Sequence, residues 1–264
     1  MIKLIATDID GTLVKDGSAD INPEIFEVVT QLKKKGIVFV AASGRQYPSI
    51  RRLFDSIHRE MIFIAENGAY IICRGVEMFK STMDKEIAKS LIYEARNLKD
   101  QNVLLTVSTP ECMYIETEDA DFQDLLINGY HNTIKQVDDI LEEDLDIIKI
   151  ALYKKDGIQT VAEEQLINKW KDNLKVVMAG AEWLDFMDSK VDKGHAIATI
   201  QKALSIQIDE TMAFGDNFND LGMLAHAGES YAVATARDEV KAAAKHIAGS
   251  YLEDGVMTEM KKLL

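Results

Sequence analysis

The first part of the chain alternates short apolar runs with a segment of helical periodicity. The runs over residues 3–7, 37–42 and 61–65 are short and rich in β-branched side chains, which favours strands that are buried on both faces. Between the first two runs, apolar residues recur at helical spacing after Asn22-Pro23, a pair typical of a helix start. Strands that alternate with helices in this way predict a parallel sheet covered by helices.

The C-terminal third repeats this alternation. A helix is predicted to begin near Asp192, and strands are predicted over residues 211–214 and 231–234. The alanine-rich segment 240–246 and the final segment 256–264 are both predicted to be helical. The two ends of the chain therefore read as parts of one α/β domain.

The middle of the chain follows a different pattern. An amphipathic helix over residues 87–98 is mixed with strands over 102–107 and 146–153, and the acidic clusters around them are typical of solvated faces. This change of pattern predicts a separate α+β domain, inserted into the parallel-sheet domain. We place the parallel-sheet domain at residues 1–81 with 186–264 and the inserted domain at residues 82–185.

Composition and charge narrow the classes of partner. The chain has 30 Lys plus Arg against 44 Asp plus Glu, a formal net charge of −14. Such a surface repels phosphate backbones and anionic lipids, which argues against a nucleic-acid or membrane partner. The sequence makes no prediction of an oligomeric state.

Cysteine use and apolar runs indicate the compartment. The two cysteines, Cys73 and Cys112, are too few for a disulfide scaffold or a four-ligand zinc site. No apolar run reaches the roughly 20 residues that span a bilayer, and the N-terminal residues lack the apolar segment of a signal peptide. We therefore expect a cytoplasmic protein.

Polar clusters follow the predicted strands or begin a predicted helix. In parallel sheets, ligands bind at the carboxyl ends of strands, so we expect clusters that are distant in the sequence to meet in one crevice. Together they describe a site for a phosphate and a divalent cation. The clusters are Asp8-Ile9-Asp10-Gly11-Thr12, Ser43-Gly44-Arg45, Lys193-Gly194 and Gly215-Asp216-Asn217-Phe218-Asn219-Asp220.

The acidic residues of these clusters predict a metal site. Asp8, Asp10 and Asp216 in one crevice would repel one another strongly unless a cation lay among them. Carboxylate oxygens without histidine or thiolate partners favour a hard ion, and Mg²⁺ is the first candidate.

The remaining polar residues predict how a phosphate is held. Lys193 would supply positive charge, and the Ser43 hydroxyl and the Gly44 amide would donate hydrogen bonds. Asn219 could donate to the same phosphate or orient Lys193. Arg45 could contact a substrate or belong to the start of a helix.

With a phosphate held in this way, a carboxylate can attack phosphorus and form an aspartyl-phosphate. Asp8 is the candidate nucleophile because it comes directly after a strand that fixes it. Asp10 could protonate the leaving oxygen and later take a proton from the attacking water. Gly11 permits the turn that brings both acids to one phosphate.

The sequence resembles the haloacid dehalogenase-like superfamily of phosphatases, in particular its Cof-type subfamily. The resemblance rests on the four polar clusters above and on two further motifs. These motifs are Glu66-Asn67-Gly68-Ala69 and Asp254-Gly255-Val256.

The resemblance implies an α/β fold with a Rossmann-like parallel-sheet core and a large inserted cap domain that determines substrate specificity. It implies Asp8 as the nucleophile, Asp10 as the acid/base, and Mg²⁺ on Asp8, Asp216 and the main-chain carbonyl of Asp10. The phosphate would be held by a further group of residues, with Thr12 and Asp220 in supporting positions. This group consists of Ile9, Ser43, Gly44, Lys193 and Asn219.

Two segments depart from the Cof-type pattern. Thr235-Ala236-Arg237 stands where relatives usually have a glycine-asparagine-alanine turn, and Tyr251 stands where they usually have asparagine. Neither segment belongs to the predicted phosphate and metal site, so the departures bear on substrate contacts rather than on the chemistry.

These observations favour a Mg²⁺-dependent phosphomonoesterase that acts on small phosphorylated metabolites, with sugar phosphates as the leading class. A phosphomutase would use the same site and return the phosphoryl group to a sugar. A catalytically silent sensor of a phosphorylated ligand is a third possibility, but binding alone does not require Asp8 and Asp10 together. A dehalogenase is disfavoured because a second acid at Asp10 serves a leaving oxygen, and an ATP-driven pump is excluded by the missing membrane spans.

Overall fold

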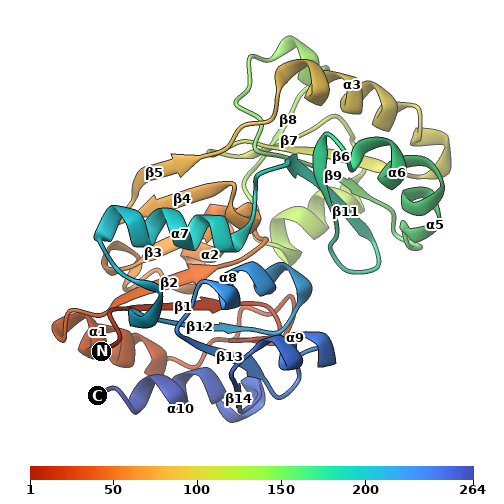
Figure 1. Cartoon of the computed structure of the whole chain (residues 1–264). Helices are drawn as coiled ribbons and strands as arrows, with labels where there is room; N and C mark the ends of the chain where they lie inside the picture. Colours follow the sequence, from red (N-terminus) through yellow and green to blue (C-terminus); the bar gives the residue numbers. More distant parts are fainter. The chain divides into compact units, whose positions relative to one another are not determined.

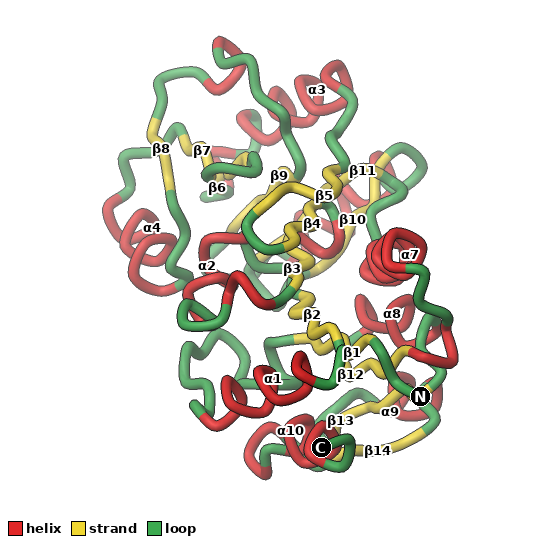
Figure 2. The backbone as a smooth tube through the Cα atoms, turned by 90° about the vertical axis from the view of Figure 1, so that its left-hand side faces the viewer, coloured by secondary structure: helices red, strands yellow, loops and turns green.

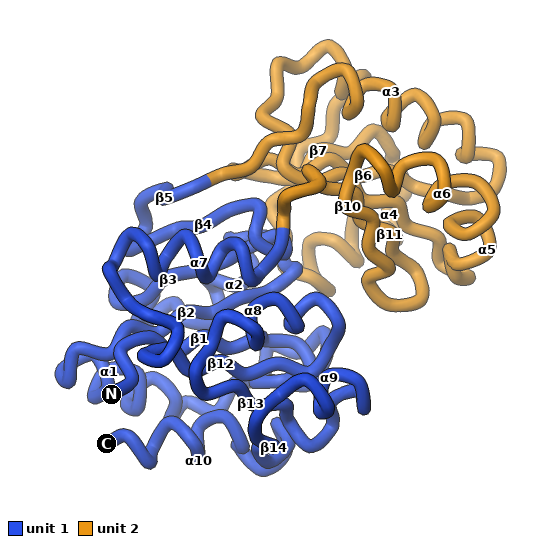
Figure 3. Tube along the Cα trace, viewed as in Figure 1, with its two compact units in different colours: residues 1–79, 192–264 blue, residues 80–191 orange.

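The computed structural model describes all residues from 1 to 264 and divides them into two compact units. The core unit comprises Met1–Phe79 and Asp192–Leu264, and the inserted unit comprises Lys80–Val191 (Figure 3). None of the helices combines the length and the apolar character needed to span a bilayer.

The core unit is built on an eight-stranded sheet with the order β14-β13-β12-β1-β2-β3-β4-β5 (Figure 1). All neighbouring strands from β14 to β3 are parallel, and β4 is antiparallel to β3. The predicted strands at 3–7, 37–42, 61–65, 211–214 and 231–234 are confirmed, with small shifts at their ends. The strands are β1 (Leu4–Asp8), β2 (Val38–Ala42), β3 (Ile62–Ala65), β4 (Tyr70–Cys73), β5 (Val76–Lys80), β12 (Thr211–Gly215), β13 (Glu229–Val233) and β14 (His246–Ala248).

Helices cover both faces of this sheet. In Figure 2, α1, α2 and α10 lie on one side of the core sheet, and α7 and α8 lie on the other. Every residue of β1 is buried, as expected for a strand between two helical layers. The helices are α1 (Glu24–Lys34), α2 (Tyr47–Leu53), α7 (Lys193–Leu204), α8 (Leu221–Ala225), α9 (Asp238–Ala243) and α10 (Gly255–Lys261).

The Asn22-Pro23 pair stands at the start of α1, as predicted. The Asn22 side-chain oxygen accepts a hydrogen bond from the Glu24 amide at 3.0 Å, which satisfies one of the unpaired donors at a helix start. The helix buries Ile25, Val28 and Leu32 against the sheet. Basic side chains stand in its last turn, where they complement the helix dipole.

One helix prediction in the core unit is partly wrong. The segment 240–246 is not helical throughout, because α9 ends at Ala243 and His246 begins β14. His246 pairs in parallel with Tyr231, and the Ser230 hydroxyl accepts a hydrogen bond from the Lys245 amide at 3.1 Å. Tertiary pairing at the sheet edge therefore overrides the helix propensity of the alanine-rich stretch.

The inserted unit contains a six-stranded mixed sheet with the order β10-β11-β9-β6-β7-β8. Its neighbours are antiparallel except for β7 and β8, which are parallel. The predicted helix and both predicted strands of this region are confirmed as α3, β6 and β9. The elements are α3 (Lys85–Arg96), β6 (Leu104–Ser108), β7 (Met113–Ile115), α4 (Ala120–Asp124), β8 (Ile134–Gln136), β9 (Lys149–Tyr153), α5 (Gln159–Val161), α6 (Ile167–Trp170), β10 (Leu174–Met178) and β11 (Trp183–Asp188).

The predicted fold class is thus confirmed: the protein is an α/β protein with a parallel core sheet and a second, inserted mixed sheet.

Candidate active site

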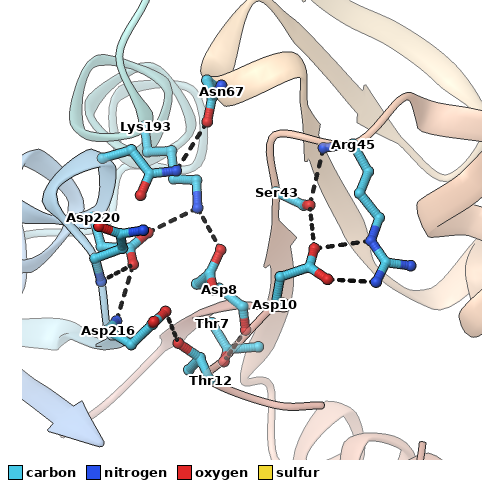
Figure 4. A network of polar contacts seen from close by, with 12 residues as sticks. Thr7, Asp8, Asp10, Thr12, Ser43, Arg45, Asn67, Lys193, Asp216 and Asp220 are labelled. Atoms are coloured by element: carbon cyan, nitrogen blue, oxygen red, sulfur yellow. Dashed lines mark hydrogen bonds and ion pairs between the residues drawn. The ribbon is translucent and has the colours of Figure 1, made fainter. Parts of the chain in front are cut away.

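The carboxyl ends of three adjacent core strands bring the predicted clusters together. Asp8 is the last residue of β1, Ser43 follows β2 directly, and Asp216 follows β12 directly. Lys193 is the first residue of α7 and reaches the same place (Figure 4). The geometry expected for ligand sites at the ends of parallel strands is therefore present.

A buried lysine joins two of the acids. The Lys193 side chain is fully buried, and its Nζ lies 2.5 Å from Asp8 Oδ1 and 2.7 Å from Asp220 Oδ1 (Figure 4). Burial alone would lower the pKa of Lys193, but the charges of Asp220 and Asp8 outweigh it and hold the pKa above its usual range. Lys193 is therefore a permanent positive charge at the base of the site.

Three carboxylates gather around this charge. Asp8, Asp216 and Asp220 each offer an oxygen, and these atoms lie within 4.8 Å of one another. Burial, followed by repulsion from Asp220, raises the pKa of Asp8 well above its usual value, and the same two causes raise the pKa of Asp216. With all three acids ionised, one lysine would leave the cluster with a net negative charge, and this repulsion contributes to the raised pKa values of Asp8 and Asp216.

Their contacts separate the three acids into two kinds. Asp220 is fully committed within the protein, because one oxygen pairs with Lys193 and the other accepts the amide hydrogens of Asp216 and Asn217 at 3.0 and 3.1 Å. Asp8 Oδ2 is buried and has no hydrogen-bond partner. Asp216 accepts a hydrogen bond from Thr12 through Oδ1, at 2.8 Å.

This donor set fits a hard divalent cation. The oxygens come from carboxylates alone, one of them is buried without a partner, and three acids share one lysine. Asp8 and Asp216 are the residues that could hold the ion, whereas Asp220 braces both Lys193 and the loop that carries Asp216.

Asp10 lies differently from the expectation that its carboxylate joins those of Asp8 and Asp216. Its Oδ2 accepts a hydrogen bond from Arg45 Nε at 2.8 Å, and its Oδ1 pairs with the second Arg45 nitrogen and accepts from the Gly17 amide (Figure 4). Ser43 Oγ stands 3.4 Å from the same carboxylate. The acid is thus held beside the three-carboxylate cluster rather than within it, and Arg45 serves as its partner.

The residues predicted to bind phosphate differ in their contacts. Ser43 Oγ accepts a hydrogen bond from the Arg45 amide at 3.0 Å, which fixes the turn after β2. Ile9 has a fully buried side chain, so only its main chain can serve a ligand. Asn219 donates to Asn67 Oδ1 at 3.0 Å and makes no hydrogen bond to Lys193.

Gly11 is required where the chain turns beneath the cluster. Its φ is +84°, and a Cβ at this position would stand 2.6 Å from Asp216 Oδ2. We expect Gly11→Ala to lower the free energy of unfolding by at least about 1 kcal/mol and to displace Asp216, which would weaken the binding of a cation such as Mg²⁺ at the three carboxylates. Urea unfolding and calorimetric Mg²⁺ titration measure the two effects.

Gly36→Ala is the matched control for this substitution. Gly36 has a similar φ of +80°, but a Cβ there would have no neighbour within 4 Å. It should share the backbone cost and leave Mg²⁺ binding unchanged. Equal Mg²⁺ affinities of the two variants would contradict the contact between Gly11 and Asp216.

Sequence reasoning missed three features of this site. The resemblance places Asp220 in a supporting position, but its contacts with Lys193 and the Asp216 loop, like the pairing of Arg45 with Asp10, are tertiary and no local pattern specifies them. Asn67 belongs to a family motif to which the sequence assigns no role, and its only sequence signal is an asparagine before a glycine, typical of a left-handed turn.

Comparisons with known proteins identify the family of the chain. The family model of the haloacid dehalogenase-like hydrolases matches residues 5–260. The chain is similar to the Escherichia coli 5-amino-6-(5-phospho-D-ribitylamino)uracil phosphatase YbjI, with 29% identity over 100% of this chain and 96% of the relative.

Solved structures show the same fold. A protein from Eubacterium rectale is 38% identical, with a TM-score of 0.92 over 100% of this chain and 99% of that one. The subclass IIB sugar phosphatase BT4131 shares the fold at 24% identity, with a TM-score of 0.80 over 99% and 98% of the two chains. The resemblance inferred from the motifs is confirmed: the chain belongs to the haloacid dehalogenase-like hydrolases, as a phosphatase of their Cof-type subclass.

Proposed function

We propose that this phosphatase hydrolyses phosphomonoesters of sugars and sugar alcohols with the help of Mg²⁺, through a phosphorylated Asp8. The observation that carries the proposal is the environment of Asp8. This carboxylate is anchored by Lys193 through one oxygen, and its other oxygen is buried without a partner at the end of β1.

The substrate class is supported by two similar proteins. The E. coli relative acts on a phosphorylated ribityl compound, and BT4131 is a sugar phosphatase. Both substrate classes present a phosphate on a polyhydroxylated carbon skeleton. All candidates for catalysis and phosphate binding lie in the core unit, and we assign the choice of leaving group to the inserted domain.

The reaction proceeds in two displacements. The cycle begins with Asp8 ionised and with Asp10 carrying a proton taken from solvent, so Asp10 gives up its ion pair with Arg45 when the substrate binds. A carboxylate oxygen of Asp8 then forms a bond to phosphorus, the ester P–O bond breaks, and Asp10 gives its proton to the leaving alkoxide oxygen. Asp10 then takes a proton from a water molecule, whose oxygen attacks the phosphorus and breaks the bond to Asp8. Inorganic phosphate leaves and both acids return to their starting state.

The remaining residues hold charge and position. Lys193 favours the ionised form of Asp8 against the effect of burial and attracts the phosphoryl oxygens, and Ser43, Gly44 and Asn219 supply hydrogen-bond donors. Before Asp10 takes up its proton, Arg45 and the Gly17 amide hold its carboxylate in place. When bound at Asp8, Asp216 and the main-chain carbonyl of Asp10, Mg²⁺ would neutralise negative charge that Lys193 alone leaves uncompensated.

Removal of divalent cations tests the metal. We expect EDTA to lower the rate of phosphate release by at least about 100-fold, since a metal supplies several kcal/mol of charge stabilisation to phosphoryl transfer. Added Mg²⁺ should restore the rate, and Asp216→Asn should raise the Mg²⁺ concentration needed for half-maximal activity. A full rate in EDTA, or an unchanged Mg²⁺ requirement in the variant, would contradict the assignment.

A sugar monophosphate distinguishes a phosphatase from a mutase. With a phosphatase, inorganic phosphate and the free alcohol should accumulate in equal amounts, with or without a priming sugar bisphosphate. Isomerised monophosphate in the primed reaction would favour the mutase. A panel of phosphorylated sugars and sugar alcohols, assayed for phosphate release, then ranks substrates by kcat/KM.

A further inference from the structure

A strained turn lies beside the phosphate site and has no part in the mechanism above. Glu66, Asn67 and Gly68 follow β3 and take positive φ values of 48°, 57° and 110° in succession. Residues in this region cost free energy and persist only where their surroundings fix them, and they cluster at functional sites. All three residues of the turn are buried.

Main-chain contacts tie this turn to two other site segments. The Asn67 amide donates to the Ser43 carbonyl and the Glu66 amide donates to the Arg45 carbonyl, both at 3.0 Å. On its other side the turn abuts the start of α7, because a Cβ on Gly68 would stand 2.6 Å from the Asp192 carbonyl oxygen. The turn therefore joins the Ser43 segment to the segment that carries Lys193.

The Asn67 side chain extends this link to a third segment. Asn67 is 4% exposed, and its Oδ1 accepts a hydrogen bond from Asn219 Nδ2 at 3.0 Å, across 152 positions of the sequence (Figure 4). The carboxamide of Asn67 lies against Gly44, because a Cβ on Gly44 would stand 3.1 Å from Asn67 Oδ1. The hydrogen bond uses one of the two hydrogens on Asn219 Nδ2.

A carboxamide has one donating and one accepting end, and only the donating end favours a phosphate oxygen. If nothing selected between the two ends, Asn219 could turn its carbonyl toward the anion, which would repel it. Asn67 Oδ1 accepts a hydrogen bond from the NH₂ group of Asn219 and thereby fixes the orientation of the Asn219 carboxamide. The second N–H of Asn219 then stays available for the substrate.

We propose that Asn67 is a positioning residue of the phosphate site, which acts by fixing the side-chain amide of Asn219. This inference rests on the proposed function in one respect, namely that Asn219 contacts the bound phosphoryl group. It also assigns a role to the Glu66-Asn67-Gly68 turn: its strained backbone holds the side-chain oxygen of Asn67 against the side-chain amide of Asn219.

The test compares three substitutions at Asn67 with Asn219→Ala. Asn67→Gly removes the acceptor and tolerates the left-handed backbone, whereas Asn67→Ala removes the acceptor and adds backbone strain. Asn67→Asp keeps an acceptor and a residue type that tolerates this conformation. For each variant we would measure kcat, KM, the inhibition constant of inorganic phosphate, and the free energy of unfolding.

We expect Asn67→Gly to raise KM and the inhibition constant of phosphate about tenfold, the worth of one hydrogen bond to a charged group, with kcat changed less. Asn67→Ala should share this effect and be less stable. In the Asn219→Ala background, Asn67→Gly should have no further effect, because the side chain that Asn67 positions is absent. Asn67→Asp should bind phosphate less well than wild type, owing to its charge, and in the Asn219→Ala background it should still weaken binding.

Two outcomes would overturn the proposal. One is an unchanged KM and phosphate inhibition constant in Asn67→Gly; the other is an additive loss in the double variant, which would mean that Asn67 acts independently of Asn219. Phosphate release by the wild-type enzyme and its loss in Asp8→Asn report on the proposed function separately, so neither outcome can be mistaken for a failure of that function.

Discussion

Asp8→Asn should abolish turnover of an aryl phosphate, with a loss on the order of 10⁴-fold or more, because it removes the attacking group itself. An amide has the shape of the carboxylate but is a poor nucleophile toward phosphorus. The fold should stay intact, since Lys193 keeps its pair with Asp220 at 2.7 Å and one of three crowded acids becomes neutral. The initial rate and the free energy of unfolding are to be measured together.

Acid quenching gives a more direct readout of the same prediction. With a ³²P-labelled substrate, the wild-type protein should retain label on Asp8 after quenching, and the variant should retain none. Asp20→Asn is the matched control, because Asp20 is an exposed turn residue outside the site. A variant at position 8 that turns over normally, or label on another residue, would remove Asp8 as the nucleophile.

Much of the core could be predicted because its signals are local. The strands that carry Asp8, Ser43 and Asp216 are short buried runs that end in polar residues, and parallel topology then gathers their carboxyl ends. The inserted unit was harder to predict, since strands such as β7 and β8 have only three residues each, too few to show a period of hydrophobic and polar positions. Their pairing depends on partners far along the chain.

The hydrogen-bond partners of the acids could not be predicted from the sequence for a related reason. Asp10 and Asp216 have the same chemistry, and only the fold places Arg45 against one and Thr12 against the other.

In the inserted unit, Lys149 on β9 and Asp185 on β11 form a buried ion pair at 3.4 Å. Charged residues in strands usually face solvent, so no pattern distinguishes such a pair beforehand.

Lys193→Met should have the second largest effect, since it removes the one positive charge within the acidic cluster. Asp8 and Asp220 would both remain buried with no cation between them. Breaking a buried ion pair from one side typically costs about 3–5 kcal/mol of unfolding free energy, and the loss of a preorganised charge at the reacting group typically costs about 10²–10³ in rate. Urea unfolding and the initial rate measure the two losses.

Lys190→Met is the control for this substitution, because Lys190 is an exposed lysine close by in the sequence. It should shift the free energy of unfolding by no more than about 0.5 kcal/mol. Mg²⁺ should restore part of the stability that Lys193→Met loses, as a cation at Asp8 and Asp216 would supply some of the missing charge. A Lys193→Met protein as stable as Lys190→Met would contradict the buried pairing.

The two partners of Lys193 make a sharper test possible. Asp220→Asn should destabilise the otherwise wild-type protein, because Lys193 loses a charge partner at 2.7 Å and the Asp216 and Asn217 amides lose a charged acceptor. In the Lys193→Met background the same substitution should stabilise the protein, because it neutralises a buried charge that nothing balances. This reversal of sign follows from charge pairing inside the fold, whereas a lysine that merely filled space would give the same sign in both backgrounds.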